Sequence, residues 1–265
     1  MVYPRAVFNQ TSQEFMGARE LLQVLAVLLL CLTHLYVSRL RFLHRQEGWL
    51  SFTGGAASAY VFVYILPKLG YQQLILAGAV PAEGWLGYLQ HHAYLVAFAG
   101  FLSYFGVTRI AERVQVDPNQ PVPLSVDEPL EALHVGAMAL YALLVGYLLA
   151  DYQGDGWAPI ALATTALTLH FIGASHVILK RYGPHYDRWI RWLMVAATIA
   201  GAGIGALTTL RPTIVALWFA FLAGAIIVIV LEQEIPHGEH SHFGWFFSGA
   251  AFFSALALTA EITVI

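Results

Sequence analysis

The stretch FTGGAASAYVFVYILP, residues 52–67, is repeated in outline 169 residues later as FLAGAIIVIVLEQEIP, residues 221–236. Both copies begin with phenylalanine, have Gly-Ala at the fourth and fifth positions, and end with an aliphatic residue and a proline, Pro67 or Pro236. Because each copy lies in a long apolar run, the two are interpreted as equivalent membrane helices in two halves of a repeat. Glycine- or proline-interrupted helices at corresponding positions point to the binding region of inverted-repeat transporters. Chance similarity between two alanine-rich apolar helices is the alternative explanation.

The composition indicates an integral membrane protein. Hydrophobic residues make up 58% of the 265 residues and charged residues 11%, whereas soluble domains carry about 25% charged residues. The predicted fold class is an all-α polytopic membrane protein that forms a single membrane domain over residues 1–265. Eight apolar stretches are near the roughly 20 residues that span a bilayer. They cover residues 20–40, 50–68, 90–110, 131–151, 158–179, 189–209, 212–231 and 244–263. A shorter apolar piece at 71–80 is expected to lie at the membrane interface.

The distribution of positive charge predicts the orientation of these spans. The first, third and fifth loops together carry nine Lys and Arg residues, whereas the second, fourth and sixth carry two. Short loops rich in positive charge stay in the cytoplasm, so both termini are expected outside the plasma membrane, here a bacterial inner membrane. The spans that contain the two copies then run in opposite directions. The sequence therefore predicts inverted three-helix repeats at 20–110 and 189–263, flanking a central helix pair at 131–179.

The run from Gly54 to Pro67 resembles the second helix of the ZIP (Zrt/Irt-like) metal transporters. The family's pattern there begins with Gly-Gly and ends in a His-Leu-Leu-Pro-Glu type of sequence. ZIP proteins have eight spans, outward termini and two inverted three-helix repeats around a central pair. The resemblance covers most of the chain at the level of topology and is specific in the second helix. It implies a ZIP-like 3+2+3 fold and transport of a divalent cation such as zinc or iron.

Most of the family's metal-ligand positions are occupied here by other residue types. The aligned positions hold Tyr64, Lys68, Tyr141, Ala142, Val145, His170 and Ala174. Only His170 keeps the ligand type of its position. Zinc requires about four N, S or O ligands, and divalent charge within a membrane requires compensating carboxylates. The sequence therefore predicts a degenerate central site. Two functions stay open: metal transport through altered ligands, and a non-transporting structural or accessory subunit of a membrane complex.

The remaining candidate metal ligands are histidines and carboxylates in the fifth and seventh spans. They are His170, His176, Glu232, Glu234, His237 and His240. Six residues separate the two histidines of the fifth span, so they lie about 120° apart on a helix and do not easily share one ion. The cluster from 232 to 242 has a metal-binding composition, with a solvated interfacial loop as its alternative. Zinc or another divalent metal is the one cofactor expected.

Enzyme and nucleic-acid functions have little support in the sequence. A haem protein would use His34, His134, His170 or His176, but no spacing of these residues enforces haem ligation. A metallohydrolase would need a base near three ligands, which only the 232–242 cluster offers. We expect no enzyme activity, and no basic run indicates nucleic acid. The expected partners are the lipid bilayer and either a second copy of the chain or another subunit of a membrane complex.

Overall fold

The computed structural model describes residues 5–40, 47–78, 92–113, 124–152, 157–182, 189–208, 210–234 and 242–262. These residues are almost entirely helical and contain no strand. The elements are α1 (Arg5–Tyr36), η1 (Val37–Leu40), α3 (Glu47–Tyr60), η2 (Val61–Ile65), α4 (Leu66–Ala77), α6 (Ala93–Arg113), α7 (Leu124–Ala150), α8 (Ala158–Tyr182), α9 (Arg191–Leu207), α10 (Pro212–Ile229), η4 (Val230–Glu234) and α11 (Phe243–Ile262). The prediction of an all-α protein is confirmed for this part of the chain.

The lengths and composition of the helices are compatible with a membrane. Five helical segments are long and apolar enough to cross one, namely Gly17–Arg39, Gly48–Ala77, Ala132–Ala150, Ala158–Ser175 and Pro212–Glu232. Three further apolar helices are shorter, at Ala93–Arg109, Arg191–Leu207 and Phe243–Thr259. In α1, Leu21, Leu25, Leu28 and Leu32 are exposed on one face. An exposed leucine stripe of this kind fits contact with lipid acyl chains.

The second apolar segment differs from the prediction. It was expected to span residues 50–68, with a separate interfacial piece at 71–80. Instead, α3, η2 and α4 form one helical segment from Glu47 to Ala77 that ends at the C-cap residue Gly78. The proline at 67 does not end the helix, because the backbone widens just before it.

Two π-helical segments occupy equivalent places in the repeated stretches. Within the first copy η2 covers Val61–Ile65, and within the second η4 covers Val230–Glu234, again at an offset of 169 residues. The Leu66 N–H donates to the carbonyl of Val61, five residues earlier, as a π-helix requires. Each π segment includes the residue four positions before the repeated proline. Since a proline ring clashes with that carbonyl in an α-helix, local widening relieves the clash.

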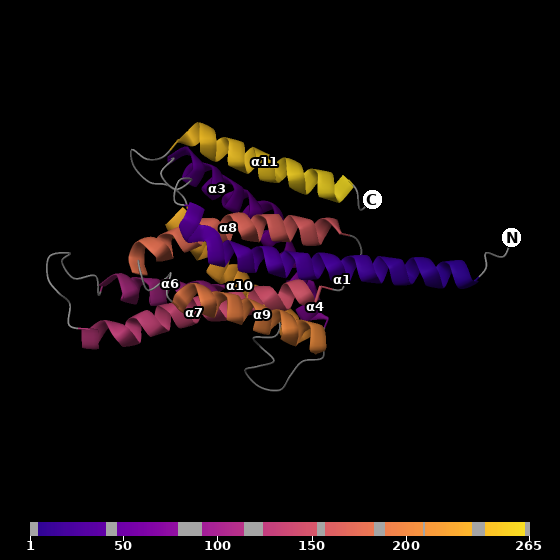
Figure 1. Ribbon diagram of the computed structural model, residues 1–265, viewed down its shortest axis with the longest axis horizontal. Helices are drawn as coiled ribbons and strands as arrows, with labels where there is room; N and C mark the ends of the chain where they lie inside the picture. Colours follow the sequence, from indigo (N-terminus) through magenta and orange to yellow (C-terminus); the bar gives the residue numbers. More distant parts are fainter. Residues whose placement is uncertain are drawn as a thin grey trace.

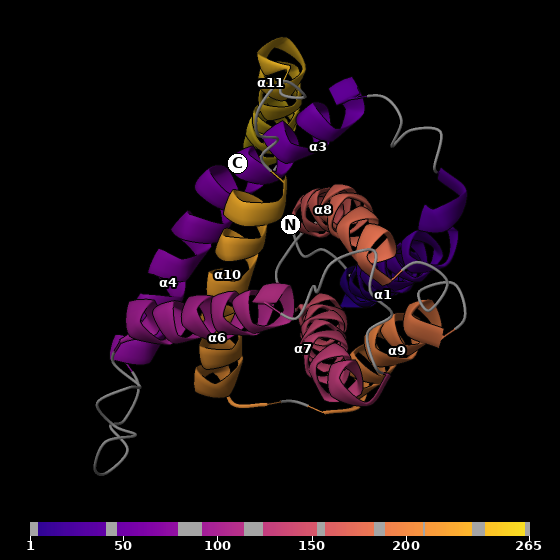
Figure 2. The ribbon, with the colours of Figure 1, turned by 90° about the vertical axis from the view of Figure 1, so that its left-hand side faces the viewer.

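Close helix crossings pair the second helix of each predicted half with the third helix of the other. In one crossing a Cβ on Gly55 of α3 would overlap the Phe246 carbonyl of α11. In the other, a Cβ on Gly224 of α10 would overlap the Ala97 carbonyl of α6. Small residues allow such backbone contact between membrane helices. Figure 2 shows α6 lying across α10, and α11 beside α3.

The same crossings are closed from the opposite side by two further glycines. A Cβ on Gly249 of α11 would overlap the Phe52 carbonyl, and one on Gly100 of α6 would overlap the Phe221 carbonyl. Phe52 and Phe221 are the first residues of the repeated stretches. The two crossings therefore use matching positions on all four helices.

The remaining long helices complete the bundle. Seen along the bundle, α1, α7, α8 and α9 are nearly end-on (Figure 2), and α1 extends past its neighbours at its N-terminal end (Figure 1). The α7 and α9 helices pack closely because Gly146 and Gly201 lie against the partner backbone. The largest buried cluster lies where α3, α7, α8 and α10 meet and includes Tyr60, Val145 and Ile226.

Candidate functional site

A cavity of about 560 Å³ lies between η2, α4, α7, α8 and α10. Asp151, Pro159 and Pro212 line it at the end of the bundle where α7 finishes and α8 and α10 begin. Deeper along the same helices it is lined by Val145 and Leu167. In the predicted topology this end of the bundle faces the outside.

The wall of the cavity is mainly aliphatic and aromatic, with a few polar groups. These groups belong to Tyr60, Tyr64, Lys68, Tyr71, Gln72, Asp151 and Tyr152. An apolar cavity with a few convergent polar groups is typical of small-molecule sites.

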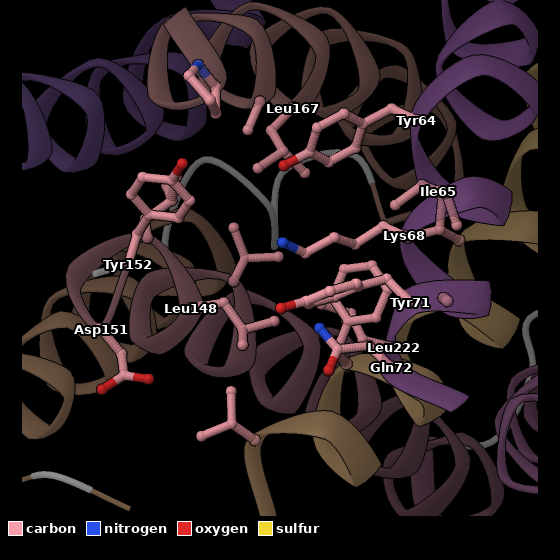
Figure 3. A pocket seen from close by; sticks show the side chains of 18 of the residues that line it. Tyr64, Ile65, Lys68, Tyr71, Gln72, Leu148, Asp151, Tyr152, Leu167 and Leu222 are labelled. Carbon is pink, nitrogen blue, oxygen red and sulfur yellow. The ribbon is translucent and has the colours of Figure 1, made fainter. Parts of the chain in front are cut away.

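Lys68 supplies the positive charge of the described wall. It stands in the first turn of α4, and its side chain reaches into the cavity between Tyr64 and Tyr71, while Tyr152 faces it from α7 (Figure 3). The Lys68 Nζ lies 5.5 Å from the centroid of the Tyr71 ring, a cation–π distance. None of the carboxylates that the structure describes forms an ion pair with this ammonium.

Asp151 contributes the one carboxylate of the cavity wall. Its carboxylate points away from the Lys68 ammonium in Figure 3. Partial burial raises the pKa of the Asp151 carboxyl above its ordinary value. The acid therefore sits at the rim, and the ammonium lies farther inside.

The π segment η2 fixes the aromatic side of the cavity. Tyr64 lies within it and stacks on Tyr60 at 5.4 Å between ring centroids. Tyr60 in turn packs edge-on against Phe253 of α11 at 5.6 Å. The crossing of α3 with α11 thereby supports the ring that faces the cavity.

A buried glutamine holds the end of α7. The amide of Gln23 in α1 donates to the carbonyls of Leu149, Ala150 and Tyr152 at 3.1, 3.0 and 2.9 Å. The last carbonyls of a helix lack partners within it, and this side chain supplies them. Gln23 therefore positions Asp151 and Tyr152 at the rim.

His170 lies deeper than the cavity and is packed among aromatic rings. It is 1% exposed, with its ring centroid 5.8 Å from Tyr141 and 5.7 Å from Phe171. His34 packs on the other side of Phe171 at 4.6 Å. Both histidines line a void of about 10 Å³, which is room for one water or one ion. Because a haem group is far larger, the structure offers it no space between these two residues.

The other predicted metal ligands do not meet at His170. Glu232 in η4 accepts a charged hydrogen bond from Arg109 of α6 at 2.7 Å. His176 and Glu234 lie in helices whose side chains at these positions fall outside the described set, and His237 and His240 lie outside the described residues altogether. Among the described side chains, no group of three or more His, Cys, Asp or Glu residues could hold a metal ion.

The sequence reasoning named part of this site and missed the rest. Tyr64 and Lys68 were singled out as replacements for ligands, and both line the cavity. Gln23, Gln72 and Tyr152 were missed, although a glutamine within an apolar helix is a costly residue that marks a specific role. No protein-family model matches the chain, and no curated protein matches it.

Proposed function

We propose that the chain is a membrane carrier built on a ZIP-like scaffold of eight spans, with two inverted three-helix repeats around a central helix pair. The observation that carries the proposal is the cavity of about 560 Å³ at the junction of the two halves and the central pair. It opens at one end of the bundle and is followed, deeper along α8, by the aromatic packing around His170. An open outer half above a closed inner half is the arrangement of a carrier that faces one side of the membrane.

The inverted repeat is supported by two independent matches between the halves. The π segments η2 and η4 fall at the same offset as the repeated sequence. The crossings at Gly55 and Gly224 join α3 to α11 and α10 to α6 in the same manner. Broken helices at corresponding positions are typical of carriers whose halves move about a central site.

The charge of the cavity argues against a divalent cation as its cargo. An ammonium and a divalent ion about 5 Å apart repel each other by about 7 kcal/mol at an effective dielectric constant near 20. The single carboxylate of the wall, Asp151, turns away from Lys68. We therefore propose a carrier whose scaffold is ZIP-like and whose main cavity takes a different cargo.

Distance measurements between spin labels test whether the bundle changes conformation as a carrier must. The single native cysteine, Cys31, is replaced by alanine, and labels are placed on the exposed positions Leu74 and Trp157 beside the cavity. A second pair at Arg39 and Phe243 reports on the opposite end of the bundle. A carrier in liposomes predicts two distance populations for each pair, with the open form of one end matching the closed form of the other. A single narrow population at both ends would contradict carriage and favour the structural or accessory subunit.

Divalent metal binding is a second candidate, favoured by the void that His34 and His170 share. Two imidazoles provide half of a tetrahedral zinc site, and Tyr104 and Tyr141 line the same void. Zinc titration of the purified protein, compared with a His34→Ala/His170→Ala variant, tests this candidate. Stoichiometric zinc that is lost in the double variant would support it. Equal zinc binding by the two proteins would exclude this pair as the site.

A further inference from the structure

We propose that the cavity binds an organic anion, with a carboxylate-like or phosphate-like group on Lys68 and an apolar, aromatic-compatible body against the facing wall. The inference deepens the proposed function, because it names the class of cargo that the carrier would take. Nothing in it depends on the metal ligands that the chain lacks.

The charge of the site favours an anion. Lys68 brings an ammonium into a mainly apolar cavity, and no described carboxylate pairs with it. A charge removed from bulk water is costly unless it is paired and hydrogen-bonded. Tyr71 offers the ammonium the face of its ring, but a ring is a weaker partner than an anion. A bound anion would complete the site electrostatically.

Hydroxyl and amide donors surround the place that the anion would occupy. The hydroxyl of Tyr64 points toward the end of Lys68, and Tyr71 and Gln72 lie on the same helical wall (Figure 3). Such groups donate hydrogen bonds to carboxylate or phosphate oxygens, and hydrogen bonds to ionised partners are stronger than neutral ones. A cation would meet the ammonium instead of a ligand.

The remaining wall fits an apolar body. Leu148, Ile160, Leu167, Phe219 and Leu222 contribute aliphatic and aromatic surface. The volume of about 560 Å³ falls within the range of about 300–1,000 Å³ that is usual for organic ligands. Inorganic phosphate would leave most of this surface without contact, so an anion with an organic body uses the cavity better.

Three isosteric probes test the charge preference directly. The full-length protein in phosphatidylcholine nanodiscs is equilibrated with 3-phenylpropionate, 3-phenylpropan-1-ol or 3-phenylpropylamine, and binding is measured by equilibrium dialysis. The proposal predicts saturable binding of the carboxylate, with the alcohol about tenfold weaker and the amine weaker still. Binding of the amine or the alcohol as tight as that of the carboxylate would overturn it, as would no saturable binding of any probe.

Substitutions at Lys68 locate the anion. Lys68→Met keeps the length and apolar stem of the side chain and removes its charge, whereas Lys68→Arg keeps the charge. We expect Lys68→Met to lose the preference for carboxylate over alcohol while still binding the alcohol, which shows that the cavity remains folded. Lys68→Arg should retain the preference. A carboxylate preference that survives in Lys68→Met would overturn the assignment.

Two further arms separate the sources of the anion and the two levels of the proposal. If phosphatidylglycerol nanodiscs suppress binding of 3-phenylpropionate to the wild-type protein, the natural anion is a lipid headgroup. Unchanged binding indicates a water-soluble organic acid. Spin-label distances that change without probe binding would overturn the anion and leave the carrier. Probe binding without any distance change would leave an anion-binding protein that is not a carrier.

Discussion

Gly55 and Gly224, 169 residues apart in the chain, make the same contact in the two halves of the molecule. Each lies directly against a backbone carbonyl of a third helix, that of Phe246 for Gly55 and that of Ala97 for Gly224. The crossings bring together helices that are distant in sequence, and one of them supports Tyr60 at the floor of the cavity. The shape of the site therefore depends on four positions that have no side chain.

Adding a methyl group at either crossing should separate the helices. Gly55→Ala and Gly224→Ala are each expected to destabilise the protein by about 1–3 kcal/mol, the usual cost of overpacking. Thermal unfolding of the purified protein in detergent measures the effect. Gly203→Ala is the matched control, because Gly203 also lies in a helix and a Cβ there would meet nothing within 4 Å. Equal stability of Gly224→Ala and Gly203→Ala would contradict the close crossing.

Removing the Gln23 amide should loosen the rim of the cavity. Gln23→Leu leaves the carbonyls of Leu149, Ala150 and Tyr152 without this donor. We expect a loss of about 1–3 kcal/mol and faster hydrogen exchange at the end of α7. Glu20→Gln, an exposed change on the same helix, serves as the control and should change neither quantity. Exchange at the end of α7 that is the same in both variants would count against the cap.

The ion pair between Arg109 and Glu232 should contribute little to stability. The Arg109 side chain is 52% exposed and that of Glu232 23%, and exposed pairs are worth about 0–1 kcal/mol. Arg109→Gln, Glu232→Gln and the double variant form a cycle that isolates the coupling by thermal unfolding. A coupling well above 1 kcal/mol would show that this end of η4 is more shielded than the structure indicates.

Asp151 should make the stability depend on pH. Since burial raises the pKa of this carboxyl in the folded state, the folded protein holds the proton at pH values where the unfolded chain has released it. The folded state is therefore penalised as pH rises above the ordinary aspartate pKa, and the penalty is complete above the raised value. Unfolding of the wild type and of Asp151→Asn across this range measures the difference. The variant should gain relative stability as pH rises, and parallel curves would contradict the prediction.

The helical class and the approximate place of the apolar segments could be predicted from composition and run length. The continuation of the second helix to Ala77 could not, because a proline normally ends a helix and only the π segment η2 lets this one continue. The partners of the glycines also lay beyond the sequence. Gly100 and Gly249 repeat at an offset of 149 residues, so a search for one common offset does not join them to Gly55 and Gly224.

The candidate site was predictable only in pieces. Tyr64 and Lys68 attracted notice because they replace ligand types in a motif, which marks a position without stating its new role. Tyr152 and Asp151 follow the end of α7 and reach the cavity through long-range packing and the cap from Gln23. His34 and His170 lie 136 positions apart in the sequence, so their shared void follows from the packing of α1 against α8.

The most direct test is the accessibility of the cavity from outside the cell. In a Cys31→Ala background, Tyr64→Cys places a thiol in the cavity wall, and Ser175→Cys places one at the deeper void. Intact cells are treated with a membrane-impermeant thiol reagent, and modification is followed over time. An outward-facing cavity above a closed inner half predicts rapid modification of Tyr64→Cys and none of Ser175→Cys. Modification of Tyr64→Cys only after the cells are opened, or equal rates at the two positions, would contradict it.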